Sequence, residues 1–306
     1  MNGSAPSRRR VSVLAGLLFC INLPGVVALV EGAPFYARNR STGFITISGV
    51  ERGYLLHVPR SIDRSRPVPL VISLHGGNLW GAAQRDISGW NDLADVEGFL
   101  VAYPSGAGRA SPRAWRAIAG ANVTRDVEFL ATLIDTLVAR YGVDPARVYV
   151  NGLSNGGAMT FAFACAEPHR VAAAGIVAGA QLQPWGACVS APPVPVVVFH
   201  GTEDPVVPYG GGTTWISARA FPSVTDWVAQ WAERNGCAPI PRDSVLSKAA
   251  SQRSYAACTG GDVVLYTLHG DGHVWPGGGA GPAWLSGTDS RALDATRVMW
   301  EFFRGR

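Results

Sequence analysis

Short apolar runs bounded by turn residues recur along the chain, and such runs are typical of buried β-strands. We expect strands over Tyr54–Val58, Val68–Leu74, Leu100–Tyr103, Val148–Val150, Ala172–Val177, Val194–Phe199 and Val263–Leu268. Apolar residues at helical spacing lie between them and predict helices that include Val127–Tyr141, Ala158–Phe163, Ser223–Arg234 and Ala292–Phe303. Because strands and helices alternate, the pattern predicts an α/β fold with a mostly parallel central sheet and helices on both faces.

The first segment has the layout of a secretory signal peptide. Arg8–Arg10 precede an apolar run that ends at Ile21, and small residues follow. Pro24 interrupts this stretch before it reaches the roughly 20 residues that a membrane span needs, so we expect no stable membrane anchor. We therefore predict a signal peptide over residues 1–33 and a secreted protein, extracellular or periplasmic, with the export route left open.

Composition and charge exclude several classes of protein. The chain has 47% hydrophobic and 16% charged residues, which is enough apolar material for a folded core and excludes a disordered chain. Its net charge is +4, but Arg8–Arg10 supply three of these charges within the predicted signal peptide. The rest of the chain is close to neutral, so we expect no nucleic-acid partner.

The cysteines predict disulfides rather than a metal site. One of the five cysteines lies in the predicted signal peptide, which leaves an even number in an exported protein. Four cysteines allow three pairings, and we favour the local one, Cys165 with Cys188 and Cys237 with Cys258. No C-x-x-C pair or nearby histidine accompanies them, so we expect no bound metal.

The segment Gly152–Gly156 matches G-x-S-x-G and carries the first candidate chemistry. It follows a predicted strand and leads into a predicted helix, which is the order of a nucleophile elbow. Small residues on both sides allow the backbone to turn tightly and lift the Ser154 hydroxyl out of the sheet. We therefore favour Ser154 as a nucleophile over a serine that only caps a glycine-rich turn.

A serine nucleophile of this kind needs an acid and then a histidine, each after a later strand. Glu203 and Asp204 both follow one such strand, and we choose Asp204. His269 and His273 follow the next, and we favour His273 because His269 still belongs to the strand end. His273 would accept the proton of the nucleophile, and Asp204 would orient the imidazole.

Two backbone N–H groups are needed to stabilise the oxyanion of an acyl-transfer reaction. We expect one from Asn155, the residue after the nucleophile, and one from Gly77 in the loop after the strand Val68–Leu74. His75 and His200 precede glycines at strand ends, where we expect histidines to make structural hydrogen bonds.

The motifs together resemble a known family. The residues that carry the resemblance are Leu74–Gly77, Asp144–Val150, Gly152–Gly157, His200–Tyr209, Trp231–Cys237 and Gly272–Gly278. They are similar to the secreted polyhydroxybutyrate depolymerase family of α/β-hydrolases, which includes feruloyl and acetylxylan esterases. The resemblance covers the chain from about Gly53 to the end and implies an α/β-hydrolase without a cofactor. No linker or repeat divides the chain, so we predict one catalytic domain over residues 34–306, and no long apolar helical insertion indicates a large lid. The resemblance also implies the triad Ser154, Asp204 and His273, and it supports the pairing of Cys237 with Cys258.

The substrate is the least specific part of the resemblance. We expect a polyester of the hydroxyalkanoate type, with a feruloyl or acetylxylan ester as the alternative, and an inactive polymer-binding scaffold as a third reading. Trp80, Trp115 and Trp275 are candidates for an aromatic substrate-binding surface. Family members often carry a Cys-Trp-Asn-Trp-like stretch where this chain has Ala114–Ala117. The sequence leaves the oligomeric state open.

Overall fold

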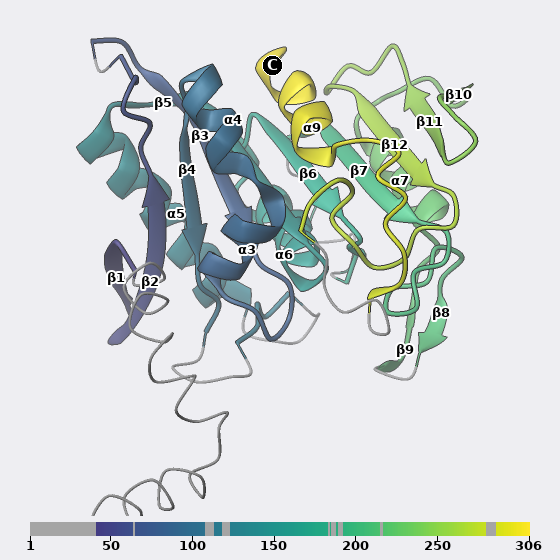
Figure 1. Ribbon diagram of the computed structural model, residues 1–306, viewed down its shortest axis with the longest axis horizontal. Coiled ribbons are helices and arrows are strands. Elements are labelled where there is room, and N and C mark those ends of the chain that lie inside the picture. The colour runs from purple at the N-terminus through teal and green to yellow at the C-terminus, as the bar shows by residue number, and fades with distance from the viewer. Residues whose placement is uncertain are drawn as a thin grey trace, which may run out of the picture. The chain divides into compact units, whose positions relative to one another are not determined.

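A computed structural model describes residues 41–63, 65–107, 113–117, 123–182, 184, 188, 192–214, 217–279 and 286–306. The predicted signal peptide lies outside these residues. A sheet of 10 strands forms the centre (Figure 1), in the order β1-β2-β4-β3-β5-β6-β7-β12-β11-β10. Its strands are β1 (Gly43–Ile47), β2 (Val50–His57), β3 (Val68–Leu74), β4 (Leu100–Pro104), β5 (Val143–Leu153), β6 (Ala173–Val177), β7 (Val196–Gly201), β10 (Arg242–Val245), β11 (Ala250–Tyr255) and β12 (Val263–Leu268).

The middle of this sheet is parallel and its edges are antiparallel. Neighbouring strands pair in parallel from β4 through β3, β5, β6 and β7 to β12. The pairs β1–β2, β2–β4, β12–β11 and β11–β10 are antiparallel. The predicted mostly parallel sheet is therefore confirmed. A small separate hairpin is formed by β8 (Gly212–Thr214) and β9 (Ser217–Phe221).

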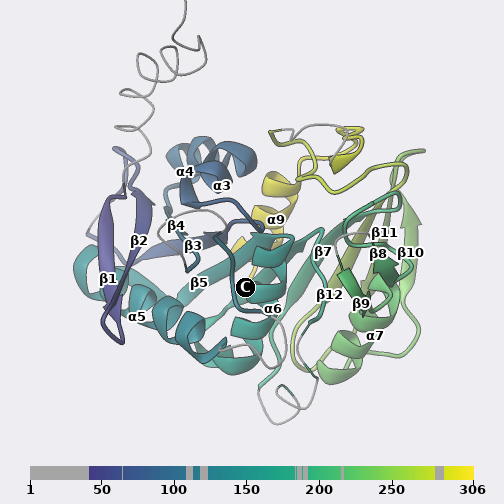
Figure 2. The same ribbon diagram turned by 90° about the horizontal axis from the view of Figure 1, so that it is seen from below.

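Helices cover both faces of the sheet (Figure 2), as predicted. One face carries α5 (Val123–Tyr141), α6 (Asn155–Ala166) and α7 (Val224–Arg234), and the other carries α3 (Gly81–Ser88), α4 (Trp90–Glu97) and α9 (Ala295–Arg304). A short 3-10 helix, Pro168–Arg170, follows α6. Each face has its own apolar core, and alternate side chains of one strand enter different cores, as Leu70 and Val71 of β3 do.

Both predicted disulfides are confirmed. Cys165 near the end of α6 is bonded to Cys188, and Cys237 after α7 is bonded to Cys258 before β12. Each bond closes a loop of about twenty residues and stabilises the fold by about 3 kcal/mol in the chain-entropy description.

The parallel strands all end at the same edge of the sheet, which places the candidate residues of distant segments together. At this edge Leu74 of β3 pairs with Gly152 of β5, and Leu268 of β12 pairs with Gly201 of β7. The loops that follow these strands contain the sequence motifs. In the described ranges, no helix is long and apolar enough to cross a membrane.

Candidate active site

Ser154 occupies a strained turn between β5 and α6. Its φ of 55° and ψ of −116° lie where residues with a side chain are rarely found, and such strain concentrates at functional sites. The Ser154 N–H donates to the Val177 carbonyl at the end of β6 (2.8 Å), and its carbonyl accepts from Ala158 N–H in α6 (3.0 Å). The strand–turn–helix geometry is that of the predicted nucleophile elbow.

The two glycines that flank this turn are required by close backbone contacts. A Cβ atom on Gly152 would lie 2.4 Å from the carbonyl carbon of Gly156. A Cβ atom on Gly156 would lie 2.3 Å from the carbonyl oxygen of Leu74. Both glycines of G-x-S-x-G are therefore required, because a side chain at either position would prevent the turn from packing against β3.

Asp204 and His273 come together at the same edge of the sheet. Nδ1 of His273 donates to Oδ2 of Asp204 (2.8 Å), and Oδ1 of Asp204 accepts the N–H groups of Val206 and Val207 (2.8 Å each). This places the proton on Nδ1 and leaves Nε2 free to act as a base in the neutral ring. Glu203 and His269, the alternatives from the sequence, are both exposed.

Burial and hydrogen bonding act in opposite directions on Asp204. Desolvation alone raises the pKa of this carboxyl, but hydrogen bonds from His200 and His273 outweigh burial, so that the pKa lies well below its ordinary value. Asp204 is therefore ionised at neutral pH and can stabilise a positive charge on His273.

His200 is a neighbour of Asp204 that the sequence motifs did not assign to the site. Its Nε2 donates to the Val207 carbonyl (2.8 Å) and lies 3.3 Å from Oδ2 of Asp204. The expectation of a structural hydrogen bond is thus confirmed, and the contact with Asp204 is additional. Nδ1 of His200 is buried and has no hydrogen-bond partner in the described part of the chain.

A cavity of about 250 Å³ opens beside Ser154. Its walls come from the elbow, from the loop after Asp204 and from β9, and they are mainly apolar. The lining residues are Ser154, Asn155, Ala158, Ala180, Leu182, Val206, Val207, Ser217, Ala220 and Phe221. Sequence reasoning missed most of this wall, because β9 and the residues near Leu182 carry no motif.

The loop after β3 lies against the elbow, where the second oxyanion donor was predicted. A Cβ atom on Gly76 would lie 3.6 Å from Cβ of Ser154, and one on Gly77 would lie 3.8 Å from Cβ of Asn155. Asn155 is the first residue of α6, where the N–H has no partner within the helix. Within the described ranges, the Gly77 N–H also has no hydrogen-bond acceptor.

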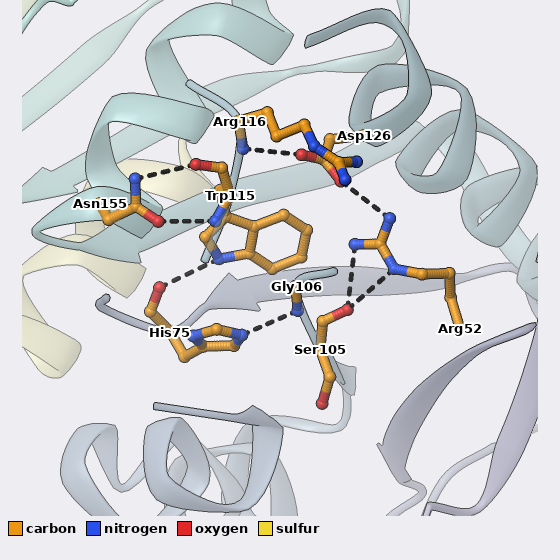
Figure 3. A network of polar contacts seen from close by, with 8 residues as sticks. All are labelled: Arg52, His75, Ser105, Gly106, Trp115, Arg116, Asp126 and Asn155. Atoms are coloured by element: carbon orange, nitrogen blue, oxygen red, sulfur yellow. Dashed lines mark hydrogen bonds and ion pairs between the residues drawn. The ribbon is translucent and has the colours of Figure 1, made fainter. Parts of the chain in front are cut away.

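A network of polar contacts surrounds this loop (Figure 3). Oδ1 of Asn155 accepts the Trp115 N–H (2.7 Å), and Nδ2 of Asn155 donates to the Trp115 carbonyl (3.1 Å). Nε1 of Trp115 donates to the His75 carbonyl (3.0 Å), and the two rings lie 5.2 Å apart between centroids. These contacts could not be predicted from the sequence, because they join residues that are far apart along the chain.

His75 is an uncharged structural histidine, as expected. Its Nδ1 donates to the Gly76 carbonyl (2.7 Å), and its Nε2 accepts the Gly106 N–H (2.8 Å), which requires a neutral ring. Burial is the largest cause that lowers the pKa of His75 to about 4.

A buried ion pair supports the other side of the same network. Nη1 of Arg52 donates to Oδ1 of Asp126 (2.8 Å), and Oδ2 of Asp126 accepts the Arg116 N–H (2.7 Å). Arg52 also donates from Nη2 to the Ser105 carbonyl (3.1 Å). Both oxygens of the buried carboxylate are therefore satisfied, as such a group requires.

The three predicted substrate-binding tryptophans have different environments. Trp115 and Trp275 are 2% and 1% exposed, and Nε1 of Trp275 donates to Oγ1 of Thr296 (2.9 Å). Neither ring offers a free face for stacking, so the expected aromatic surface is not formed by these two residues. Trp80 is partly exposed and immediately precedes α3. The apolar side chains that line the cavity are instead aliphatic, apart from Phe221.

No group of three or more His, Cys, Asp or Glu side chains in the described ranges is arranged to hold a metal ion. The candidate side chains at this edge of the sheet are the hydroxyl of Ser154, the imidazole of His273 and the carboxylate of Asp204.

Comparisons with known proteins identify the family. The family model described as "Esterase PHB depolymerase" matches residues 52–225, which is more than half of the chain. Feruloyl esterase C from Emericella nidulans is 28% identical over 94% of this chain and 99% of that protein. Poly(3-hydroxyalkanoate) depolymerase C from Paucimonas lemoignei is 26% identical over 86% of this chain and 68% of that protein.

Comparison with solved structures gives the fold. The structure of an acetyl xylan esterase from Aspergillus awamori matches with a TM-score of 0.57 and 19% identity, over 73% of this chain and 89% of that one. It supports the α/β-hydrolase fold, with the parallel sheet and covering helices described above. With this fold and the family match, the chain belongs to the esterase family of the polyhydroxybutyrate depolymerases.

Proposed function

We propose that the protein is a secreted serine carboxylic-ester hydrolase in which Ser154, His273 and Asp204 act as a catalytic triad. The observation that carries the proposal is the 2.8 Å hydrogen bond from His273 to Asp204, at the sheet edge where the elbow presents Ser154. The two disulfides support an exported protein, because such bonds persist in oxidising compartments.

The reaction proceeds in two halves. Oγ of Ser154 attacks the ester carbonyl carbon while Nε2 of His273 takes the hydroxyl proton, and the N–H groups of Gly77 and Asn155 stabilise the oxyanion. The tetrahedral intermediate collapses to an acyl-enzyme, and His273 donates its proton to the departing alkoxide. Water then attacks the acyl-enzyme with His273 as base, which releases the acid and restores Ser154.

We propose a polyester of hydroxyalkanoate units, such as polyhydroxybutyrate, as the leading substrate. The family and the Paucimonas lemoignei relative support this choice. The small apolar side chains of Ala158, Ala180 and Val207 at the cavity are suited to a short aliphatic unit. A feruloyl ester is the second candidate, because Phe221 offers the cavity an aromatic contact and the Emericella nidulans relative is a feruloyl esterase.

The two candidates are separated by acid release from a polyhydroxybutyrate suspension and from methyl ferulate, each with the Ser154→Ala variant as the blank. We expect the polymer suspension to clear, with little turnover of the aryl ester. Turnover of methyl ferulate without clearing would replace the polyester by a plant cell-wall ester. Clearing that persists in the Ser154→Ala variant would contradict the triad. Binding of the polymer without release of any acid would indicate an inactive scaffold.

A further inference from the structure

The segment 113–117 contacts both places from which the oxyanion donors of the proposed reaction come. On one side it meets the side chain of Asn155, and on the other it meets the loop that contains Gly77. We propose that the Asn155 side chain, bound to Trp115, is a positioning group that fixes the N–H groups of Gly77 and Asn155 relative to each other. This inference rests on the proposed function.

The first step is the double hydrogen bond of Asn155. Its side chain contacts the backbone N–H and the carbonyl of the same residue, Trp115, at 2.7 and 3.1 Å. The amide group therefore cannot rotate without breaking both bonds. Because Asn155 begins α6 directly after Ser154, this contact fixes the direction of its own N–H at the elbow.

The second step is the attachment of the Gly77 loop to the same segment. Before Gly77, the His75 carbonyl accepts Nε1–H of Trp115 (3.0 Å), and after Gly77, the Asn78 N–H donates to the Arg113 carbonyl (2.8 Å). Gly77 is thus held between two anchor points on the segment that also holds Asn155. Figure 3 shows Trp115 bonded to the Asn155 side chain through its backbone and to the His75 carbonyl through its indole N–H.

The third step is that the segment itself is fixed in place. Its Arg116 N–H donates to Asp126, which is ion-paired with the buried Arg52. The Arg52 guanidinium lies 5.7 Å from the centroid of the Trp115 ring. Ala114 forms a β-bridge with Ala107. A rigid support of this kind is what preorganised donors require, because oxyanion-hole donors act at about 2.7–3.1 Å and a displacement of about 1 Å can reduce the rate 100-fold.

Asn235 provides a control for a purely structural role of Asn155, because its side chain also makes two hydrogen bonds to the backbone. Nδ2 of Asn235 donates to the Val194 and Gly261 carbonyls, both at 2.9 Å, and this residue is fully buried. It follows α7 and contacts the segment before β7, whereas the candidate site lies at the ends of the strands. Asn155→Ala and Asn235→Ala each remove two side-chain hydrogen bonds to the backbone, and Asn235→Ala also removes the bond that Oδ1 accepts from Arg234 (3.3 Å). Only the first variant touches the proposed oxyanion site.

The experiment measures kcat and KM on a soluble ester such as p-nitrophenyl butyrate, together with the melting temperature. We expect Asn155→Ala to reduce kcat by about 10- to 100-fold with KM changed less than about threefold. Asn235→Ala should lower the melting temperature at least as much and leave kcat within about twofold of the wild type. A trifluoromethyl ketone, which forms a tetrahedral adduct with the nucleophile, should lose affinity for Asn155→Ala roughly in proportion to kcat/KM.

Trp115→Phe provides a second variant, because it removes the indole N–H and leaves the backbone partners of Asn155 in place. We expect a smaller reduction in kcat, about fivefold to 20-fold, again without a comparable change in KM. If Asn155→Ala does not fold, Trp115→Phe tests the positioning role in its place: kcat should fall while KM stays nearly unchanged.

Two results would overturn the inference. One is a folded Asn155→Ala or Trp115→Phe variant with wild-type kcat, and the other is an equal loss of kcat in Asn235→Ala. The Ser154→Ala variant separates this failure from failure of the proposed function. If Ser154→Ala is inactive while Asn155→Ala keeps full kcat, only the positioning role is wrong. If Ser154→Ala retains activity, the proposed function itself is wrong.

Discussion

At the scale of single residues, the candidate site depends on groups whose charge is set by burial and by hydrogen bonds. Burial raises the pKa of Asp204, but hydrogen bonds from His200 and His273 outweigh this effect and keep the carboxyl ionised. His75 is also buried, but its Nε2 accepts a hydrogen bond from the Gly106 N–H, so this nitrogen carries no proton and the ring is uncharged. The two groups therefore respond differently to acid.

The low pKa of His75 predicts a pH dependence of stability. The pKa falls from 6.5 to about 4 on folding, so between these values the unfolded chain binds a proton that the native state does not. The free energy of unfolding should fall by up to about 3 kcal/mol as the pH drops through this window. Urea unfolding at pH 7 and pH 4.5 checks this, with His75→Gln as the control.

The His75→Gln variant lacks the ring that bonds to Gly76 and Gly106 and packs against Trp115, so it should be less stable than the wild type at pH 7. Its stability should also fall less on acidification, since Asp204 and the other carboxyls titrate in both proteins. Equal pH slopes for the two proteins would show that His75 does not titrate across this window.

At the scale of the elements, the site depends on how tightly the elbow fits against β3. Much of this could be predicted, because apolar runs mark the central strands and the G-x-S-x-G motif marks the turn between β5 and α6. The edge strands β1, β10 and β11 were missed, since their exposed positions interrupt the apolar pattern. The cavity wall at β9 was missed because it carries no motif.

The contact between Gly156 and β3 predicts a large effect from one methyl group. In a Gly156→Ala variant the new Cβ would lie 2.3 Å from the Leu74 carbonyl oxygen and 2.6 Å from the His75 carbonyl oxygen, both backbone atoms. We expect a loss of about 2–4 kcal/mol in unfolding free energy, measured by urea denaturation. Gly210→Ala is the matched control, because a Cβ there meets no atom within 4 Å. Equal stabilities of the two variants would contradict the steric requirement at the elbow.

At the scale of the whole molecule, the parallel sheet brings together the loops that follow β3, β5, β7 and β12, and the order of motifs along the chain reflects this arrangement. The prediction that Ser154, Asp204 and His273 each follow a strand of this sheet is therefore confirmed, while their role as a triad stays a prediction. The sequence did not place Trp115 and Trp275, because a tryptophan beside a motif can be exposed or buried, and only the three-dimensional packing decides which. The Asn155–Trp115 contact also depends on packing between segments 40 residues apart.

The most direct test of the central proposal is covalent labelling by a fluorophosphonate, which reacts with a serine activated by a neighbouring histidine. We predict one adduct per chain in the intact mass and a modified peptide containing Ser154. The Ser154→Ala variant should show no adduct, and His273→Gln should react at least about 100-fold more slowly. An adduct on another residue, or ester hydrolysis by an unlabelled Ser154→Ala variant, would contradict Ser154 as the nucleophile.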